Sequence, residues 1–200
     1  MRVIAGSARG TNLKGPGGLN VRPTSDRVRQ AIFNVIEGLV EGAAVLDAFA
    51  GTGAMGVEAL SRGARLCVFI DKDSRCRNIE RTNLLRTHTI DRAKVLGGEI
   101  FSAVPRLRRL GDTFDLLFFD PPYDLLGSER GWGRLFEFME ELMENGLVSS
   151  DALFVVEHRR SAAPPEAPES LVVDDTRKYG DTVITMFTPA DISPDETPSM

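Results

Sequence analysis

The sequence of 200 residues predicts one α/β domain, with a mostly parallel sheet that helices cover on both faces. Short apolar segments alternate along the chain with segments whose apolar residues recur at helical spacing. A Gly-x-Gly-x-x-Gly sequence from Gly51 to Gly56 directly follows one apolar segment, and the tetrapeptide Asp120-Pro121-Pro122-Tyr123 follows another. Both motifs therefore lie where open α/β sheets bind ligands, beyond the carboxyl ends of the strands.

The N-terminal part predicts a small hairpin followed by a helix. Residues 2–6 and 11–14 have strand character on either side of a turn that contains Gly10. Thr24 or Ser25 can cap the next segment, whose apolar residues recur at helical spacing.

The remainder of the chain predicts a main domain of alternating strands and helices. Strands separated by helices require right-handed crossovers, which produce a parallel sheet. The two final strands have no helical segment between them, so the last one is expected to be antiparallel. Residues 189–200 are rich in acidic residues and proline, which is typical of a disordered tail. The predicted strands are 43–48, 66–70, 92–97, 114–119, 152–157 and 182–187, and the predicted helices are 54–62, 74–86, 100–109 and 132–144.

The glycine-rich segment predicts a site for a nucleoside-containing cofactor. Its glycines allow a tight turn and a close approach of the ligand to the backbone, and the helix that follows offers unpaired N–H groups. The next predicted strand ends in Asp71, twenty residues after Gly51, where a carboxylate can accept hydrogen bonds from both ribose hydroxyls. Asp73 is the alternative if that strand ends later. This pattern alone fits a nicotinamide dinucleotide as well as an adenosyl cofactor.

The tetrapeptide predicts a site for a planar amino group. The Asp120 carboxylate and the Pro121 carbonyl are both acceptors, and the two prolines remove backbone donors. Tyr123 offers a ring face on which a flat base can stack. The alternative interpretation is a rigid turn after a strand. The glycine-containing segment 124–133 that follows is expected to be either a loop that closes over the substrate or a connector anchored by Trp132.

Charge is unevenly distributed along the chain. The net charge of −5 does not by itself favour a nucleic-acid partner. Residues 1–30, however, hold six basic residues and one acidic residue, so they carry +5 and the rest of the chain carries −10. A basic segment on an acidic domain is expected if that segment binds RNA, whereas a merely solvated surface is the alternative. The candidate RNA-binding residues are Arg2, Arg9, Arg22, Arg27 and Arg29.

Other classes of protein are disfavoured by composition. The sequence contains no apolar run of membrane-spanning length and no signal peptide, so a cytoplasmic protein without membrane contact is expected. Cys67 and Cys76 lie in a predicted strand and helix, which favours free thiols. His88 and His158 have no partners at metal-ligand spacing, so no metal is expected.

Taken together, these motifs resemble one family of bacterial enzymes. The glycine-rich loop combined with the Asp-Pro-Pro-Tyr tetrapeptide resembles S-adenosylmethionine-dependent amino methyltransferases. Further segments resemble the RsmD type, which methylates guanine N2 in small-subunit (16S) ribosomal RNA, and the likeness extends over about residues 1–188. These segments are Met1–Gly6, Arg9–Gly10, Arg22–Arg29, Leu46–Gly53, Glu58–Ala64 and Lys178–Thr182.

The resemblance implies the fold, the cofactor and a role for each motif. The expected fold is a Rossmann-like, seven-stranded, mostly parallel methyltransferase sheet with its last strand antiparallel. Residues 1–38 would add a hairpin and helix that bind RNA, and residues 39–188 would form the S-adenosylmethionine-dependent methyltransferase domain. The resemblance assigns the acceptor site to Asp120, Pro121 and Tyr123, the methionine end of the cofactor to Asp47, Gly51 and Gly53, the ribose to Asp71, and the adenine to Glu99 and Ile100.

The implied partner is 16S ribosomal RNA within a small-subunit assembly particle, and a monomer is expected. Three alternatives fit the same motifs. A DNA or RNA adenine-N6 methyltransferase, or a cytosine-N4 enzyme, uses the same tetrapeptide. A nicotinamide-dependent oxidoreductase would use the glycine-rich loop and leave the tetrapeptide without a role. A non-catalytic ribosome-assembly factor would keep the fold without the reaction.

Overall fold

A computed structural model of the chain describes residues 1–15, 17 and 25–190. Arg22, Thr24 and residues 191–200 of the expected tail therefore lie outside the described residues, whereas Pro189, where that tail was predicted to begin, is the last residue of a strand. The strands are β1 (Ala44–Asp47), β2 (Leu66–Asp71), β3 (Ala93–Gly97), β4 (Phe114–Phe119), β5 (Val148–Arg159), β6 (Leu171–Tyr179) and β7 (Thr182–Pro189). The helices are α1 (Asp26–Val35), α2 (Glu37–Val40), α3 (Ala54–Ser61), α4 (Ser74–Arg86), α5 (Val104–Arg108), α6 (Tyr123–Leu126) and α7 (Glu129–Glu144), with 3-10 turns η1 (Ile90–Arg92) and η2 (Ile100–Ser102).

The seven strands form one sheet in the order β3-β2-β1-β4-β5-β7-β6. Strand β1 pairs in parallel with β2 on one side and with β4 on the other, so the strand order reverses there. Strand β7 pairs antiparallel with both β5 and β6. The predicted sheet, with its reversed last strand, is confirmed. The reversal beside β1 marks the edge of the sheet at which ligands bind in this class of fold.

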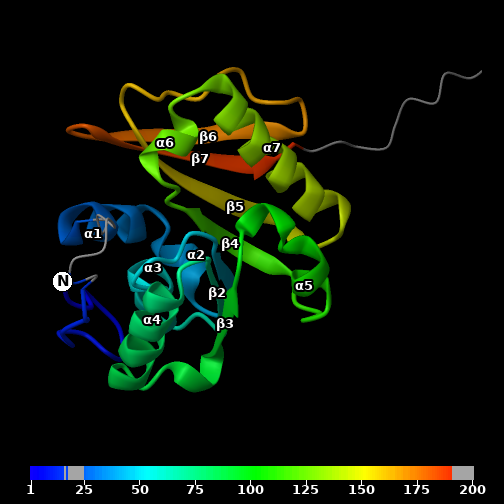
Figure 1. The fold of residues 1–200 in the computed structure, drawn as a ribbon. Helices are drawn as coiled ribbons and strands as arrows, with labels where there is room; N and C mark the ends of the chain where they lie inside the picture. Colours follow the sequence, from blue (N-terminus) through cyan, green and yellow to red (C-terminus); the bar gives the residue numbers. More distant parts are fainter. Residues whose placement is uncertain (16, 18–24, 191–200) are drawn as a thin grey trace, which may run out of the picture.

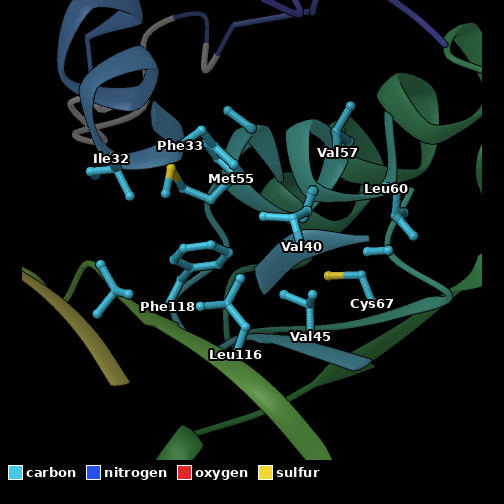
Figure 2. Packing of buried hydrophobic residues seen from close by; sticks show 14 of the residues in the cluster. Ile32, Phe33, Val40, Val45, Met55, Val57, Leu60, Cys67, Leu116 and Phe118 are labelled. Atoms are coloured by element: carbon cyan, nitrogen blue, oxygen red, sulfur yellow. The ribbon is translucent and has the colours of Figure 1, made fainter. Parts of the chain in front are cut away.

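Alternate residues of the central strands pack into two separate cores. Val45 and Phe118 face the core formed with α1 to α4, whereas Leu46 and Leu117 face the core formed with α5, α6 and α7. Figure 2 shows the first core, in which the Phe33 ring on α1 lies above Phe118, with ring centroids 5.6 Å apart. The two-residue period of each strand thus buries both faces of the sheet, and the ribbon in Figure 1 shows the helices gathered on the two sides.

Three elements differ from the sequence-based prediction. The N-terminal hairpin is reduced to one isolated bridge between Arg2 and Asn12. The helix expected over 100–109 is split into η2 and α5. Strand β6 was not predicted, because only Leu171 of its nine side chains is buried and the segment therefore lacks an apolar pattern. Among the described helices, none is long and apolar enough to cross a membrane.

Segment 124–133 is mostly helical rather than an irregular loop, and its closure over the substrate stays a prediction. It contains α6 and the first turns of α7, which Ser128 caps by accepting a hydrogen bond from the Gly131 amide. Trp132 is buried, and its indole N–H donates to the Ala162 carbonyl at 3.1 Å. The alternative expectation, a connector anchored by Trp132, describes the structure.

Candidate cofactor and acceptor site

A pocket of about 560 Å³ lies beyond the carboxyl ends of β1 to β4. Its volume falls within the usual range for small-molecule sites. Most of the cofactor and acceptor residues predicted from the sequence line this pocket. They are Asp47, Gly51, Asp71, Asp73, Glu99, Ile100, Asp120 and Pro121.

The glycine-rich loop forms the floor of this pocket between β1 and α3. Gly51 and Gly53 have φ values of 55° and 76°, a left-handed conformation that other residues adopt only with strain. Gly56 packs directly against β2. A Cβ atom at this position would come within 2.3 Å of the Phe69 ring, so only glycine fits. Gly53 does not itself line the pocket, so it shapes the loop that Gly51 and Thr52 present.

Two carboxylates accept hydrogen bonds from backbone amides of the glycine-rich segment. The Asp47 Oδ2 atom accepts a hydrogen bond of 2.9 Å from the Gly56 amide, and the Asp71 Oδ2 atom accepts one of 2.9 Å from the Gly51 amide. Burial raises the pKa of Asp47 to about 7, although the Gly56 hydrogen bond opposes the shift. Burial also raises the pKa of Asp71. Negative charge is therefore costly here, and a cationic ligand would relieve that cost.

Asp71 and Asp73 play different parts at the end of β2. Asp73 caps helix α4 through the Arg75 amide and forms an ion pair of 2.6 Å with the Arg75 guanidinium. This pairing lowers the pKa of Asp73 to about 2. Asp71 is instead the last residue of β2. One of its carboxylate oxygens accepts a hydrogen bond from the Gly51 amide and the other accepts one from the Asp73 amide. Its place at the strand end supports Asp71 as the ribose partner.

Beyond β3, Glu99 and Ile100 differ in environment. Ile100 is largely buried but lines the pocket, where it offers an apolar contact for a flat ring. The Glu99 side chain is 59% exposed and forms an ion pair of 3.2 Å with Lys72 at the pocket edge. Two arginines that the sequence gave no reason to choose shape these loops. Arg77 donates to the carbonyls of Asp71 and Lys72, while Arg106 donates to the carbonyls of Gly97 and Glu99.

The tetrapeptide borders the pocket beyond β4. Asp120 and Pro121 both line the pocket, and Pro121 is buried. Tyr123 begins helix α6, but its side chain lies outside the described part of the protein. Arg159, the last residue of β5, also lines the pocket and was not among the predicted site residues.

A second missed residue, Glu80 on α4, lies behind the loop. Within the described part of the chain its side chain is fully buried, and neither carboxyl oxygen has a hydrogen-bond partner. Burial raises the pKa of Glu80 to about 9, with Asp47 and Asp71 adding to the shift. Its Cγ lies within 3.2 Å of the place where a Cβ on Gly53 would stand. Its position inside an amphipathic helix gave no signal that it would be buried.

The basic N-terminal residues divide into an exposed and a buried group. Arg2, Arg9 and Arg27 are exposed. Arg29 is fully buried, where it donates to the Arg2 carbonyl and pairs with Asp26 at 3.1 Å. The expectation that Arg29 forms part of an RNA-binding surface is therefore incorrect for this structure. Arg29 lies three and four residues before the buried Ile32 and Phe33, so its side chain points to the same inner face of α1.

The N-terminal segment is fastened to α3 by a buried acid. The Glu58 carboxylate accepts hydrogen bonds of 2.8 and 3.0 Å from the Ile4 and Ala5 amides. It also pairs with Arg62 at 2.8 Å and lies 3.7 Å from the Arg29 Nε atom. The segment is thus a fixed part of the domain, next to the glycine-rich loop.

The residues present fit S-adenosylmethionine. The loop offers a floor for the methionine part, Asp71 offers a ribose acceptor at a strand end, and Ile100 offers an apolar surface for adenine. The acids below the loop have raised pKa values, which suits a cofactor that carries a sulfonium and an ammonium group. In the described residues no group of His, Cys, Asp or Glu side chains is arranged to hold a metal ion.

Comparisons with known proteins agree with this geometry. A model of the family described as conserved hypothetical protein 95 matches residues 1–188. Ribosomal RNA small subunit methyltransferase D of Escherichia coli K12 is 34% identical over 84% of this chain and 79% of that protein. The protein of the same name from Haemophilus influenzae is 30% identical over 85% of this chain and 84% of that protein.

Solved structures show the same relationship. The structure of yhhF from Escherichia coli matches with a TM-score of 0.77 and 32% identity, covering 94% of this chain and 97% of that one. An RNA methyltransferase from Salinibacter ruber, in complex with S-adenosyl-L-homocysteine, matches with a TM-score of 0.62 over 87% of this chain and 98% of that one. At 16% identity the second match shows a shared fold alone. The chain belongs to the RsmD family of S-adenosylmethionine-dependent methyltransferases.

Proposed function

We propose that this protein transfers a methyl group from S-adenosylmethionine to the N2 amine of a guanine in small-subunit 16S ribosomal RNA. One observation carries the proposal. The cofactor-type wall, with Gly51 and Asp71, and the acceptor-type wall, with Asp120 and Pro121, border the same pocket. A methyl donor on the first wall and an amine on the second would therefore lie next to each other.

The chemistry asks the protein mainly for placement. When bound, S-adenosylmethionine supplies an electrophilic methyl group. The N2 amine of guanine is a poor nucleophile, because its lone pair is delocalised into the ring. The Asp120 carboxylate and the Pro121 carbonyl accept its two N–H groups, which aims the lone pair and stabilises the positive charge that develops on nitrogen. Holding the reactants in line supplies roughly 7–11 kcal/mol in favourable cases.

The acceptor base must leave its stack to reach this pocket, which costs least in a single-stranded loop of RNA. We assign Tyr123 to stack on the base once it has entered, a contact worth about 1–3 kcal/mol. We assign RNA binding to residues 1–38, with Arg2, Arg9 and Arg27 as the exposed cations that contact phosphates. Arg22 belongs to the same proposal, although it lies outside the described residues.

The test is methyl transfer from labelled S-adenosylmethionine to unmodified small ribosomal subunits, protein-free 16S ribosomal RNA and duplex DNA. Nucleoside mass spectrometry identifies the product, and N2-methylguanosine from either RNA acceptor is expected. Asp120→Ala should lose transfer by a factor of about a hundred or more while keeping its affinity for the cofactor. The matched control is Asp174→Ala, at an exposed position of β6 that does not line the pocket.

Other products would contradict the proposal in distinct ways. N6-methyladenine would keep the role of Asp120 but assign the protein to adenine. Cofactor binding without transfer to any acceptor would favour an assembly factor. Loss of cofactor binding in Asp120→Ala would show that this residue supports the fold of the pocket rather than the acceptor.

A further inference from the structure

We infer that Arg159 selects guanine as the acceptor base by donating hydrogen bonds to its O6 and N7 atoms. This inference rests on the proposed function, because it assigns the recognition of the base that receives the methyl group. Arg159 is the final residue of β5, is exposed, and lines the same pocket as Asp120 and Pro121.

The acceptor wall cannot by itself distinguish guanine from other bases. The Asp120 carboxylate and the Pro121 carbonyl are acceptors, so they hold any exocyclic amine, whether it belongs to guanine, adenine or cytosine. Pro121 and Pro122 have no backbone N–H group. The two prolines therefore offer no backbone donor that could recognise a carbonyl on the base, and a neighbouring strand can supply one.

The sheet register places Arg159 beside this wall. Strands β4 and β5 are parallel neighbours, and Phe119 pairs with Val156. Asp120 follows directly after Phe119, and Arg159 follows three residues after Val156. Because neighbouring strands lie about 4.8 Å apart, the two chain segments leave the sheet side by side. A long arginine side chain at this point can reach across a base that Asp120 holds at its amine.

The charge distribution in the pocket points to the same residue. Among the described residues that line the pocket, the cationic side chains are Lys72, Arg75 and Arg159. Lys72 directly follows β2 and Arg75 lies in the first turn of α4, both on the cofactor side, whereas Arg159 ends the strand that pairs with β4. Arg159 is thus the cation on the acceptor side of this described lining.

The geometry of an arginine suits guanine in particular. Guanine presents O6 and N7 as two adjacent acceptors, and a guanidinium group can donate to both at once. A base with an amino group in place of O6 would present a donor to the guanidinium and be rejected. The N2 amine stays available to Asp120, so one residue selects the base while the other orients the reacting atom.

The test compares two acceptors that differ at one atom. Small subunits are reconstituted with 16S ribosomal RNA that carries either guanine or 2,6-diaminopurine at the methylated position. Both bases have the N2 amine, but diaminopurine has an amino group in place of O6. Wild-type protein should prefer guanine by roughly 5- to 150-fold in kcat/KM. Arg159→Met should lose most of this preference, and Arg159→Lys should keep only part of it.

Arg160→Met is the matched control, because Arg160 is also exposed but does not line the pocket. It should retain the wild-type preference. Cofactor affinity and thermal unfolding confirm that each variant folds.

An unchanged guanine preference in Arg159→Met would overturn the inference, even if both rates fell together, and would leave the proposed function standing. Failure of the wild-type protein to methylate guanine would overturn both. The two failures are distinguishable because only the second appears in the wild-type measurement.

Discussion

The side-chain amide of Asn83 joins the glycine-rich loop to the N-terminal segment. Its nitrogen donates to the Thr52 carbonyl at 2.9 Å and to the Lys14 carbonyl at 3.1 Å, and its oxygen accepts from the Lys14 amide at 2.7 Å. Asn83 is fully buried on α4. One side chain therefore fixes the position of the proposed cofactor loop relative to the proposed RNA-binding segment.

We predict that Asn83→Leu weakens cofactor binding about tenfold and lowers stability. The substitution leaves the buried Thr52 carbonyl without its donor, and an unpaired buried polar group costs about 1–3 kcal/mol. Titration calorimetry with S-adenosylmethionine and thermal unfolding measure the two effects. Asn78→Leu, at an exposed position of the same helix, should change neither by a comparable amount. A lower melting temperature with unchanged affinity would show that the loop keeps its shape without this contact.

Arg29 and Arg27 should behave in opposite ways. Arg29 is buried next to Glu58, and two of its nitrogens, Nε and Nη1, have no hydrogen-bond partner in the described structure. We predict that Arg29→Met lowers the free energy of unfolding by about 3 kcal/mol, because it leaves the buried Glu58 carboxylate with less compensating charge. Arg27→Met, at an exposed position, should change it by less than about 0.5 kcal/mol.

Urea unfolding and RNA binding at several salt concentrations separate these two arginines. Arg27→Met should weaken binding to 16S ribosomal RNA and reduce the salt dependence of that binding. If Arg29→Met were as stable as the wild type, the structural role assigned to its guanidinium would be wrong.

We predict that the buried carboxyl group of Glu80 makes the stability of the protein depend on pH. Burial raises the pKa of Glu80 from 4.5 to about 9. Between these two pH values the folded protein therefore keeps a proton that the unfolded chain has released. The unfolded chain then binds fewer protons, and the contribution of Glu80 to the free energy of unfolding falls as pH rises from about 4.5 to 9. By pH 7 the free energy of unfolding has fallen by on the order of 3 kcal/mol relative to its value below pH 4.5.

Glu80→Leu should therefore stabilise the protein, and the gain over wild type should increase from pH 5 to pH 9. Urea unfolding at pH 5, 7 and 9 measures it. Glu137→Leu replaces an exposed glutamate on α7 and should show no such trend. A constant difference between Glu80→Leu and wild type across this range would mean that Glu80 is ionised in the folded protein.

The sequence predicted the parts of the fold that a strong local pattern controls. The strand at 114–119 and the helix at 74–86 have the predicted bounds, because apolar residues and a capping Asp73 define them locally. Strand β6 escaped prediction because it lies at the edge of the sheet and buries little. Its formation depends on pairing with β7, which is a tertiary effect that no local pattern encodes.

The site was predictable where motifs carry the chemistry and unpredictable where tertiary packing does. Asp71 and Asp120 stand at strand ends, so the rule that ligands bind there located them from the sequence. Arg29 was misassigned because its charge indicated a surface residue, whereas its helical position placed it on the buried face. Arg159 and Asn83 belong to no motif, and they join the site only because β5 and α4 pack next to it.

The helical structure of segment 124–133 leads to a comparison between two glycines of α7. A Cβ atom on Gly131 would lie 1.6 Å from the Leu125 carbonyl oxygen, whereas a Cβ atom on Gly133 would meet nothing within 4 Å. Gly131→Ala must therefore displace α6 from α7, which we expect to cost at least about 1–3 kcal/mol. Gly133→Ala should raise stability by up to about 1 kcal/mol, since alanine favours a helix interior.

Thermal unfolding of the two variants measures this difference, and the fluorescence of the buried Trp132 reports whether the start of α7 has moved. Because α6 begins at Tyr123, directly after the acceptor wall, Gly131→Ala should also reduce methyl transfer more than cofactor binding. A mobile loop over residues 124–133 would instead accept both alanines equally. Equal stability of Gly131→Ala and Gly133→Ala would thus contradict the close packing of α6 against α7 and favour a mobile segment.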